Sequence, residues 1–87
     1  MSDQQKFDKL KEDVKKLAKR PTDDEMLNLY ALYKQTTVGD VNIPEPGFFA
    51  FQEKQKWTAW NGKKGMKRDV AMTSYNDFAE KIIQKYK

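Results

Sequence analysis

Apolar residues recur at intervals of three and four positions in separate stretches of the chain, and this spacing limits what the chain can fold into. The first such stretch carries Phe7, Leu10, Val14 and Leu17. A stretch near the C-terminus carries Ala71, Tyr75, Phe78 and Ile82. This spacing places the apolar side chains on one face of an α-helix. Because such helices bury their apolar faces on one another, the sequence predicts an all-α fold.

Four helices are expected. They cover residues 5–19, 23–38, 51–61 and 67–86. Between the second and third, residues 40–50 contain Pro44, Pro46 and Gly47 and have no helical period, so we expect a loop there. Such a connection is long for a small bundle and favours a crossover over a simple hairpin. We expect residues 1–87 to form one domain.

Two signals mark where the second helix begins. Pro21 ends the first helix, because proline cannot continue it. Thr22 is followed three residues later by Glu25, which is the spacing of a capping box. The second helix is therefore predicted to start just after Thr22.

The composition excludes several classes of site. The chain has no cysteine and no histidine. Disulfides and the preferred zinc or copper ligands are therefore absent, and Ser-His and Cys-His nucleophile pairs are impossible. We therefore expect no metal and no cofactor. Composition does not exclude an enzyme that uses lysine or a carboxylate, although nothing in the sequence points to one. The N-terminus is polar and no apolar run is long enough for a membrane span, so we expect a cytoplasmic protein without stable membrane insertion.

Positive charge is concentrated in one segment. Residues 52–68 hold six basic side chains and one acidic one, whereas the whole chain has a net charge of +4. A local basic patch favours an anionic partner. A small basic helical nucleic-acid-binding domain is therefore one alternative, and a solvated helix face is another.

The second helix brings aromatic and cationic residues to one side. Residues three and four apart are neighbours on a helix, so Tyr30, Tyr33 and Lys34 lie near one another. Lys56 and Trp57 adjoin on the third helix, and Tyr75 belongs to the apolar stripe of the fourth. Aromatic surface together with positive charge suits a nucleotide. Each ring could equally be a core aromatic with one wet edge.

The sequence resembles the acyl-CoA-binding protein family over essentially the whole chain. The resemblance rests on residues 29–40 (LYALYKQTTVGD), 46–47 (PG), 56–61 (KWTAWN) and 64–65 (KG). It implies a skewed four-helix bundle with a crossover after the second helix. It also implies a monomeric intracellular carrier and pool former that binds medium- to long-chain fatty acyl-CoA, without catalysis and without nucleic acid.

The resemblance also implies roles for individual residues. By position, Tyr30, Lys34 and Lys56 match the residues that hold the ribose 3′-phosphate, and Tyr33 and Tyr75 match aromatics at the nucleotide. Further positions that line the ligand site match Lys15, Ala31 and Leu32. The acyl chain is expected along Phe7, Lys11, Met26 and Leu27.

Two departures from the family pattern concern stability. Lys63 stands where an apolar residue is usual, so its stem must lie over the bundle while its charge reaches water. Met66 and Lys67 replace the small polar residue that usually caps the fourth helix, which loses about 1 kcal/mol of capping.

Overall fold

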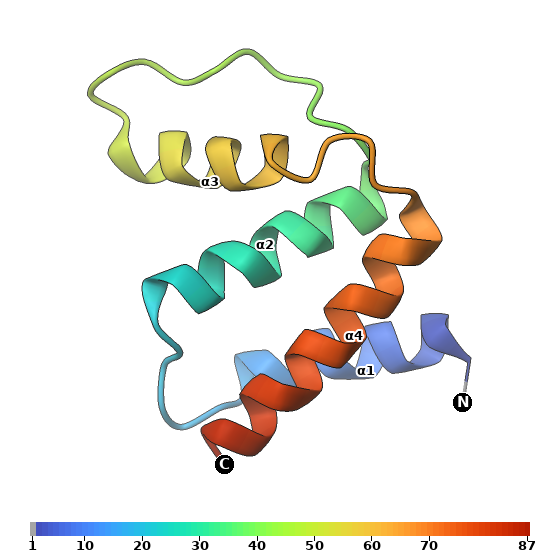
Figure 1. The fold of residues 1–87 in the computed structure, drawn as a ribbon. Helices are drawn as coiled ribbons and strands as arrows, with labels where there is room; N and C mark the ends of the chain where they lie inside the picture. Colours follow the sequence, from blue (N-terminus) through green and yellow to red (C-terminus); the bar gives the residue numbers. More distant parts are fainter. Residues whose placement is uncertain (1) are drawn as a thin grey trace.

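The computed structural model describes residues 2–87, and within that range it contains four helices and no strand (Figure 1). They are α1 (Asp3–Lys15), α2 (Asp23–Thr37), α3 (Phe51–Asn61) and α4 (Arg68–Lys85). Residues 40–50 form the predicted crossover between α2 and α3. The predicted all-α fold is therefore confirmed, and the bounds of α3 are those expected from the sequence.

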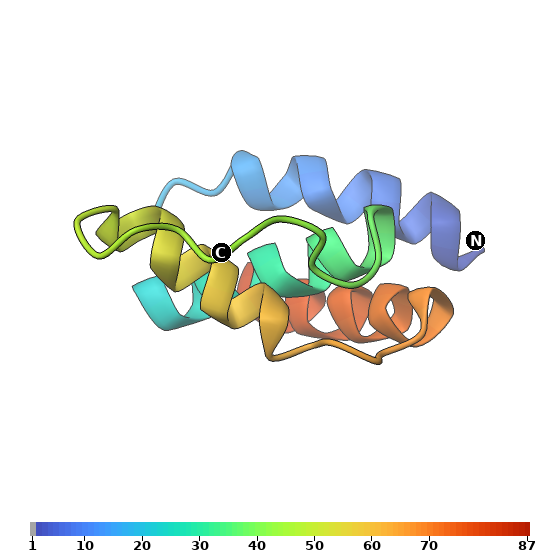
Figure 2. The ribbon, with the colours of Figure 1, turned by 90° about the horizontal axis from the view of Figure 1, so that it is seen from above.

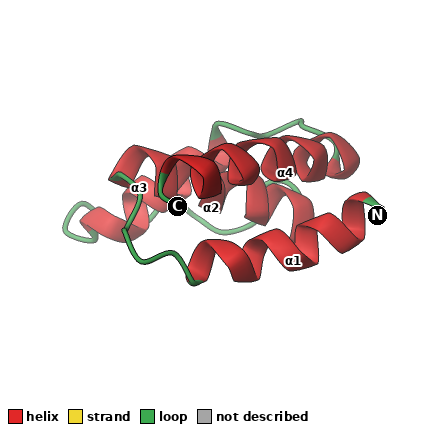
Figure 3. Cartoon of the chain, turned by 90° about the horizontal axis from the view of Figure 1, so that it is seen from below, coloured by secondary structure: helices red, strands yellow, loops and turns green. Residues whose placement is uncertain are grey.

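The helices pack in an order that differs from their order in the chain. α2 packs on α4 and on α3, whereas α1 packs on α4. Among the described residues, no Cα atom of α1 lies within 8 Å of a Cα atom of α2. Figures 2 and 3 show α1 along one side of the other three helices. α1 and α2 consequently meet only through their side chains.

The predicted capping box at the start of α2 is confirmed. The Thr22 hydroxyl accepts a hydrogen bond from the Glu25 amide at 3.2 Å, and the Glu25 carboxylate accepts one from the Thr22 amide at 2.9 Å. These bonds satisfy two amides that the first turn of a helix leaves free. At α4, by contrast, Lys67 occupies the N-cap and no side chain caps the helix, in agreement with the predicted loss.

The predicted bounds of the first helix were wrong at both ends. It begins at Asp3, because Ser2 and Gln5 form a capping box that the apolar spacing did not reveal. It ends at Lys15 rather than residue 19. The amides of Lys16 and Leu17 bond to carbonyls three residues back, which tightens and closes the last turn. The chain then turns several residues before Pro21.

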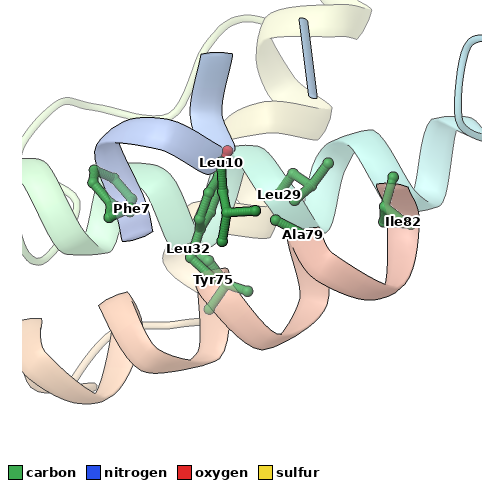
Figure 4. Close-up of a cluster of buried hydrophobic side chains, with 7 residues drawn as sticks. All are labelled: Phe7, Leu10, Leu29, Leu32, Tyr75, Ala79 and Ile82. Carbon is green, nitrogen blue, oxygen red and sulfur yellow. The ribbon is translucent and has the colours of Figure 1, made fainter. Parts of the chain in front are cut away.

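The core lies where α1, α2 and α4 meet (Figure 4). Its buried side chains are Phe7, Leu10, Leu29, Leu32, Tyr75, Ala79 and Ile82. Leu17 packs against this cluster although it lies beyond the end of α1. Thus the apolar spacing identified the side that faces the core even where the helix does not continue. None of the helices is both long and apolar enough to cross a membrane, as judged over the described residues.

Candidate functional site

A groove runs between α1 and α2, whose backbones do not approach each other closely. It has a volume of about 300 Å³ and reaches Tyr75 of α4. The lining residues are Lys11, Val14, Lys15, Met26, Leu29, Tyr30, Tyr33 and Tyr75. Six of these were singled out from the sequence as ligand-site or acyl-chain residues. The structure therefore brings half of the predicted set into one concave surface.

A second groove, between α2 and α3, adjoins the first. Its volume is about 390 Å³, and it is lined by Arg20, Asp23, Met26, Leu27, Tyr30, Gln52, Gln55 and Lys56. Met26 and Tyr30 line both grooves. Two further residues predicted from the sequence, Leu27 and Lys56, line this second groove. The two grooves thus form one continuous surface that is apolar at Met26 and Leu27 of α2 and cationic at Lys56 of α3.

Three aromatic rings hold the inner wall of the first groove. Phe7 stacks on Tyr33 with ring centroids 5.7 Å apart, and it meets Tyr75 edge-on at 4.9 Å. Burial, with a smaller effect of Tyr33, raises the pKa of Tyr75 to about 12. Tyr75 therefore stays a neutral phenol near pH 7. Phe7 itself is buried, so it supports the wall from behind rather than lining the groove.

Lys34 and Lys56 both lie over aromatic rings. The Lys56 Nζ is 5.5 Å from the centroid of the Tyr30 ring, and the Lys34 Nζ is 5.0 Å from a ring of Trp60. Within residues 2–87 neither ammonium group is within 4.0 Å of a carboxylate, although Glu53 lies three residues before Lys56. Both charges therefore remain available to an anion. Lys34 lies one turn beyond Tyr30 and lines neither groove.

The other predicted residues differ in their surroundings. The side chains of Ala31 and Leu32 are buried, so the structure does not bring them to either groove. Lys15 pairs with Glu12 at 3.8 Å, and Lys11 pairs with Asp8 at 3.7 Å. The Lys15–Glu12 pair is exposed and the Lys11–Asp8 pair is partly exposed. Ion pairs at the surface contribute little stability. Lys11 and Lys15 can therefore exchange their partners for a ligand at small cost.

A polar network that the sequence did not reveal lies at the C-terminal end of α2. The Gln35 amide, which is 1% exposed, donates to Asp40 Oδ1 at 2.8 Å and to the Met66 carbonyl at 2.9 Å. The same Asp40 oxygen accepts from the Gly65 amide at 2.9 Å. The Gly65 bond, and then that from Gln35, lowers the pKa of Asp40 below its ordinary value. This network joins the crossover and the turn before α4 to the end of α2.

The two tryptophans hold the crossover onto α3. The Trp60 indole donates to the Gly39 carbonyl at 2.7 Å, and the Trp57 indole donates to the Ile43 carbonyl at 2.9 Å. Gly39 has a φ of 100°, a conformation that glycine adopts without strain. Most residues of this network and of the tryptophan contacts lie in segments 35–40, 56–61 and 64–65, which were singled out from the sequence. The spacing of these segments did not predict which of their side chains would be in contact.

Metal binding finds no support in the side chains around the two grooves. Over residues 2–87 there is no group of three or more acidic, histidine or cysteine side chains that could hold a metal ion. The two grooves therefore offer apolar surface, phenols, amides and ammonium groups, with the Arg20–Asp23 ion pair in the second groove. These can bind an amphiphilic anion through both of its ends.

Comparison with known proteins finds a family model and a named relative that match most of the chain. The model of the acyl-CoA-binding protein family matches residues 4–79. A protein from a Hypsibius species, provisionally named as an acyl-CoA-binding protein, is 45% identical over 85 residues, which cover 98% of this chain and 96% of that protein. These names do not favour the nucleic-acid alternative.

Solved structures are similar over nearly the whole chain. Acyl-CoA-binding protein 2 of Oryza sativa superposes with a TM-score of 0.91 and 32% identity, covering 97% of this chain and 93% of that one. The Moniliophthora perniciosa protein superposes with a TM-score of 0.89 and 43% identity, covering 99% and 84% respectively. Both are described as acyl-CoA-binding proteins.

Proposed function

Because this chain belongs to the acyl-CoA-binding protein family, we propose that it is a carrier and pool former for medium- to long-chain fatty acyl-CoA. It acts as a monomer in the cytoplasm and catalyses no reaction. The observation that carries the proposal is the pair of grooves that meet at Met26 and Tyr30. One ligand with an apolar tail and an anionic head fits such a surface.

The anionic head belongs at the cationic end of this surface. In our proposal Tyr30, Lys34 and Lys56 hold the ribose 3′-phosphate, with Tyr30 as a hydroxyl donor. Two facts support it: Lys56 already lies over the Tyr30 ring, and neither lysine has a carboxylate partner among the described residues. Tyr33 and Tyr75 then lie at the nucleotide, on the wall that Phe7 supports.

The acyl chain belongs along the apolar part of the same surface. Met26 lines both grooves and Leu27 lines the second, while Lys11 contributes its aliphatic stem to the first. A palmitoyl chain has about fourteen methylenes, and each gains ~0.8 kcal/mol when fully buried. This sets an upper bound of about 11 kcal/mol before the cost of ordering the chain is subtracted. An open groove buries the acyl chain only in part and so gains only part of this free energy. The CoA head and the acyl tail must therefore both contribute to binding.

Calorimetry tests the proposal directly. We expect 1:1 binding of palmitoyl-CoA, much weaker binding of CoA, and little binding of free palmitate, because each fragment uses one end of the surface. Native mass spectrometry of the purified protein should show acyl-CoA retained from the host. Equal affinities for palmitate and palmitoyl-CoA would contradict a carrier that recognises the CoA head.

A further inference from the structure

Three phenylalanines form an exposed cluster that neither the core nor the two grooves described above use. Phe48, Phe49 and Phe51, here named the phenylalanine tip, are 71%, 87% and 65% exposed. Their rings lie together, with centroids 5.3 Å apart between Phe48 and Phe49 and 6.2 Å apart between Phe48 and Phe51. A clustered exposed apolar patch, unlike a single exposed side chain, indicates an interaction surface.

The position of the phenylalanine tip explains why no other part of the described chain covers it. Phe48 and Phe49 are the end of the crossover, and Phe51 begins α3. α3 packs on α2 and on no other helix among residues 2–87. Figures 1 and 2 both show the turn between the crossover and α3 at one extremity of the molecule. The tip therefore protrudes and can contact an extended surface without a steric clash from the rest of the described chain.

Basic side chains follow the tip along the layer to which it belongs. The Lys54 Nζ lies 5.9 Å from the Phe48 ring centroid and 3.5 Å from the Glu45 carboxylate. The crossover, α3 and the turn before α4, residues 40–68, hold six basic and three acidic side chains, a net charge of +3 out of +4 for the whole chain. Four of the six basic side chains belong to residues 63–68, which follow the end of α3 and lie away from the tip. The layer as a whole is thus complementary to an anionic surface, while its tip is apolar.

The tip is also continuous with apolar surface in the bundle. Phe51 and Leu27 line a pocket of about 450 Å³ between α2 and α3, together with Thr58 and Ala59. Leu27 also lines the groove that carries Lys56. An apolar route therefore leads from the tip toward the surface to which the acyl chain was assigned.

From these observations we propose that the phenylalanine tip docks into the interface of an anionic lipid bilayer and loads or unloads acyl chains there. Aromatic side chains favour the interfacial region of a bilayer, and basic residues beside them are attracted by anionic headgroups. Docking is peripheral and reversible, because three rings on a turn do not span a membrane. The loading role rests on the proposed function; the docking itself does not.

The test uses the whole protein and vesicles without acyl-CoA. Co-sedimentation with phosphatidylcholine vesicles containing 30% phosphatidylserine should show binding that weakens in 0.5 M NaCl and with phosphatidylcholine alone. Replacing both Phe48 and Phe49 by serine should lower the vesicle partition coefficient at least about tenfold, since each fully buried phenylalanine is worth about that factor or more. Phe51 is kept, because it lines the pocket between α2 and α3.

Val70→Ser is the matched control. Val70 is 48% exposed in the first turn of α4, which begins at the end of the layer opposite to the start of α3 (Figure 1). This variant should bind vesicles like the unmodified protein. Both variants remove exposed side chains, so circular dichroism and the thermal midpoint should be unchanged. Phe49→Ala alone is the milder second variant, with a smaller loss in the same direction.

Three outcomes would overturn the docking proposal. One is vesicle binding by the double variant that equals that of the unmodified protein. Another is a double variant that keeps vesicle binding but loses palmitoyl-CoA affinity in solution, which would assign the tip to the ligand. A third is that sedimentation velocity shows the unmodified protein as a dimer and the double variant as a monomer, while both bind vesicles. A protein that docks but binds no palmitoyl-CoA would refute the carrier function and leave docking intact.

Discussion

Lys56→Ala is the variant that best tests how the ligand is held. The Lys56 Nζ lies over the Tyr30 ring at 5.5 Å and is in no ion pair among residues 2–87. Its removal should hardly affect folding, because an exposed cation–π contact is worth only ~0.5–1 kcal/mol. Its effect on acyl-CoA affinity should be larger. Hydrogen bonds to charged groups contribute ~1.5–3 kcal/mol, which corresponds to about a 10- to 150-fold weaker Kd.

The assay pairs the protein change with a change in the ligand. Isothermal titration calorimetry would compare palmitoyl-CoA with palmitoyl-dephospho-CoA, which lacks the 3′-phosphate, on the unmodified protein and on Lys56→Ala. If Lys56 acts on that phosphate, the loss caused by Lys56→Ala should shrink sharply with the truncated ligand. The four affinities form a cycle whose coupling energy isolates this one contact.

Two further variants sharpen the cycle. Lys34→Ala should behave like Lys56→Ala, because both lysines are assigned to the same dianion. Lys81→Ala removes a lysine from an exposed position on α4, away from both grooves, and should leave both affinities nearly unchanged. If the losses from Lys56→Ala and from ligand truncation simply add, the lysines are general electrostatic attractors. The site assignment would then fail even though the carrier function could stand.

Three predictions concern stability and are measured by urea or thermal unfolding. Thr22→Ala should cost ~1 kcal/mol with unchanged ligand affinity, and an unmoved urea midpoint would refute the capping role. Lys67→Ser should add ~1 kcal/mol by supplying the missing cap of α4; equal midpoints would refute it. Hydrogen bonds from Tyr86, then Lys85 and Thr22, lower the pKa of Glu25 from 4.5 to about 2. Because the unfolded chain takes up that proton first, this contribution is present above pH 4.5 and is lost as pH falls toward 2. The difference in stability between the unmodified protein and Glu25→Gln should vanish over that range; a difference independent of pH would contradict this role of the Glu25 carboxylate.

Local signals in the sequence were sufficient for most of the secondary structure. The start of α2 follows from Thr22 and Glu25, because a capping box is made within one turn and needs no tertiary partner. The apolar spacing placed Leu10 and Ile82 in the core correctly. The end of α1 was not predictable in this way, since it depends on how the chain turns to bring Leu17 onto the core.

For the candidate site too, one part could be predicted from the sequence and another part depended on packing. Which residues share a helix face is a property of the chain alone, so Met26, Tyr30 and Tyr33 could be grouped before the structure was known. Which faces are left uncovered is decided by packing. α1 rests on α4 and leaves a groove beside α2, whereas Ala31 and Leu32 turn into the interior.

Contacts between distant segments of the chain could not be predicted from the sequence either. The meeting of Gln35, Asp40 and Gly65 joins three parts of the chain, and spacing in one dimension does not encode it. Phe51 belongs to the apolar bulk of its helix by composition, yet it is exposed because α3 has a single helical neighbour. The sequence by itself thus determined the helices, their caps and their apolar faces, through interactions within a few residues. Only the tertiary structure decided which of those faces is buried and which is open to a ligand or a membrane.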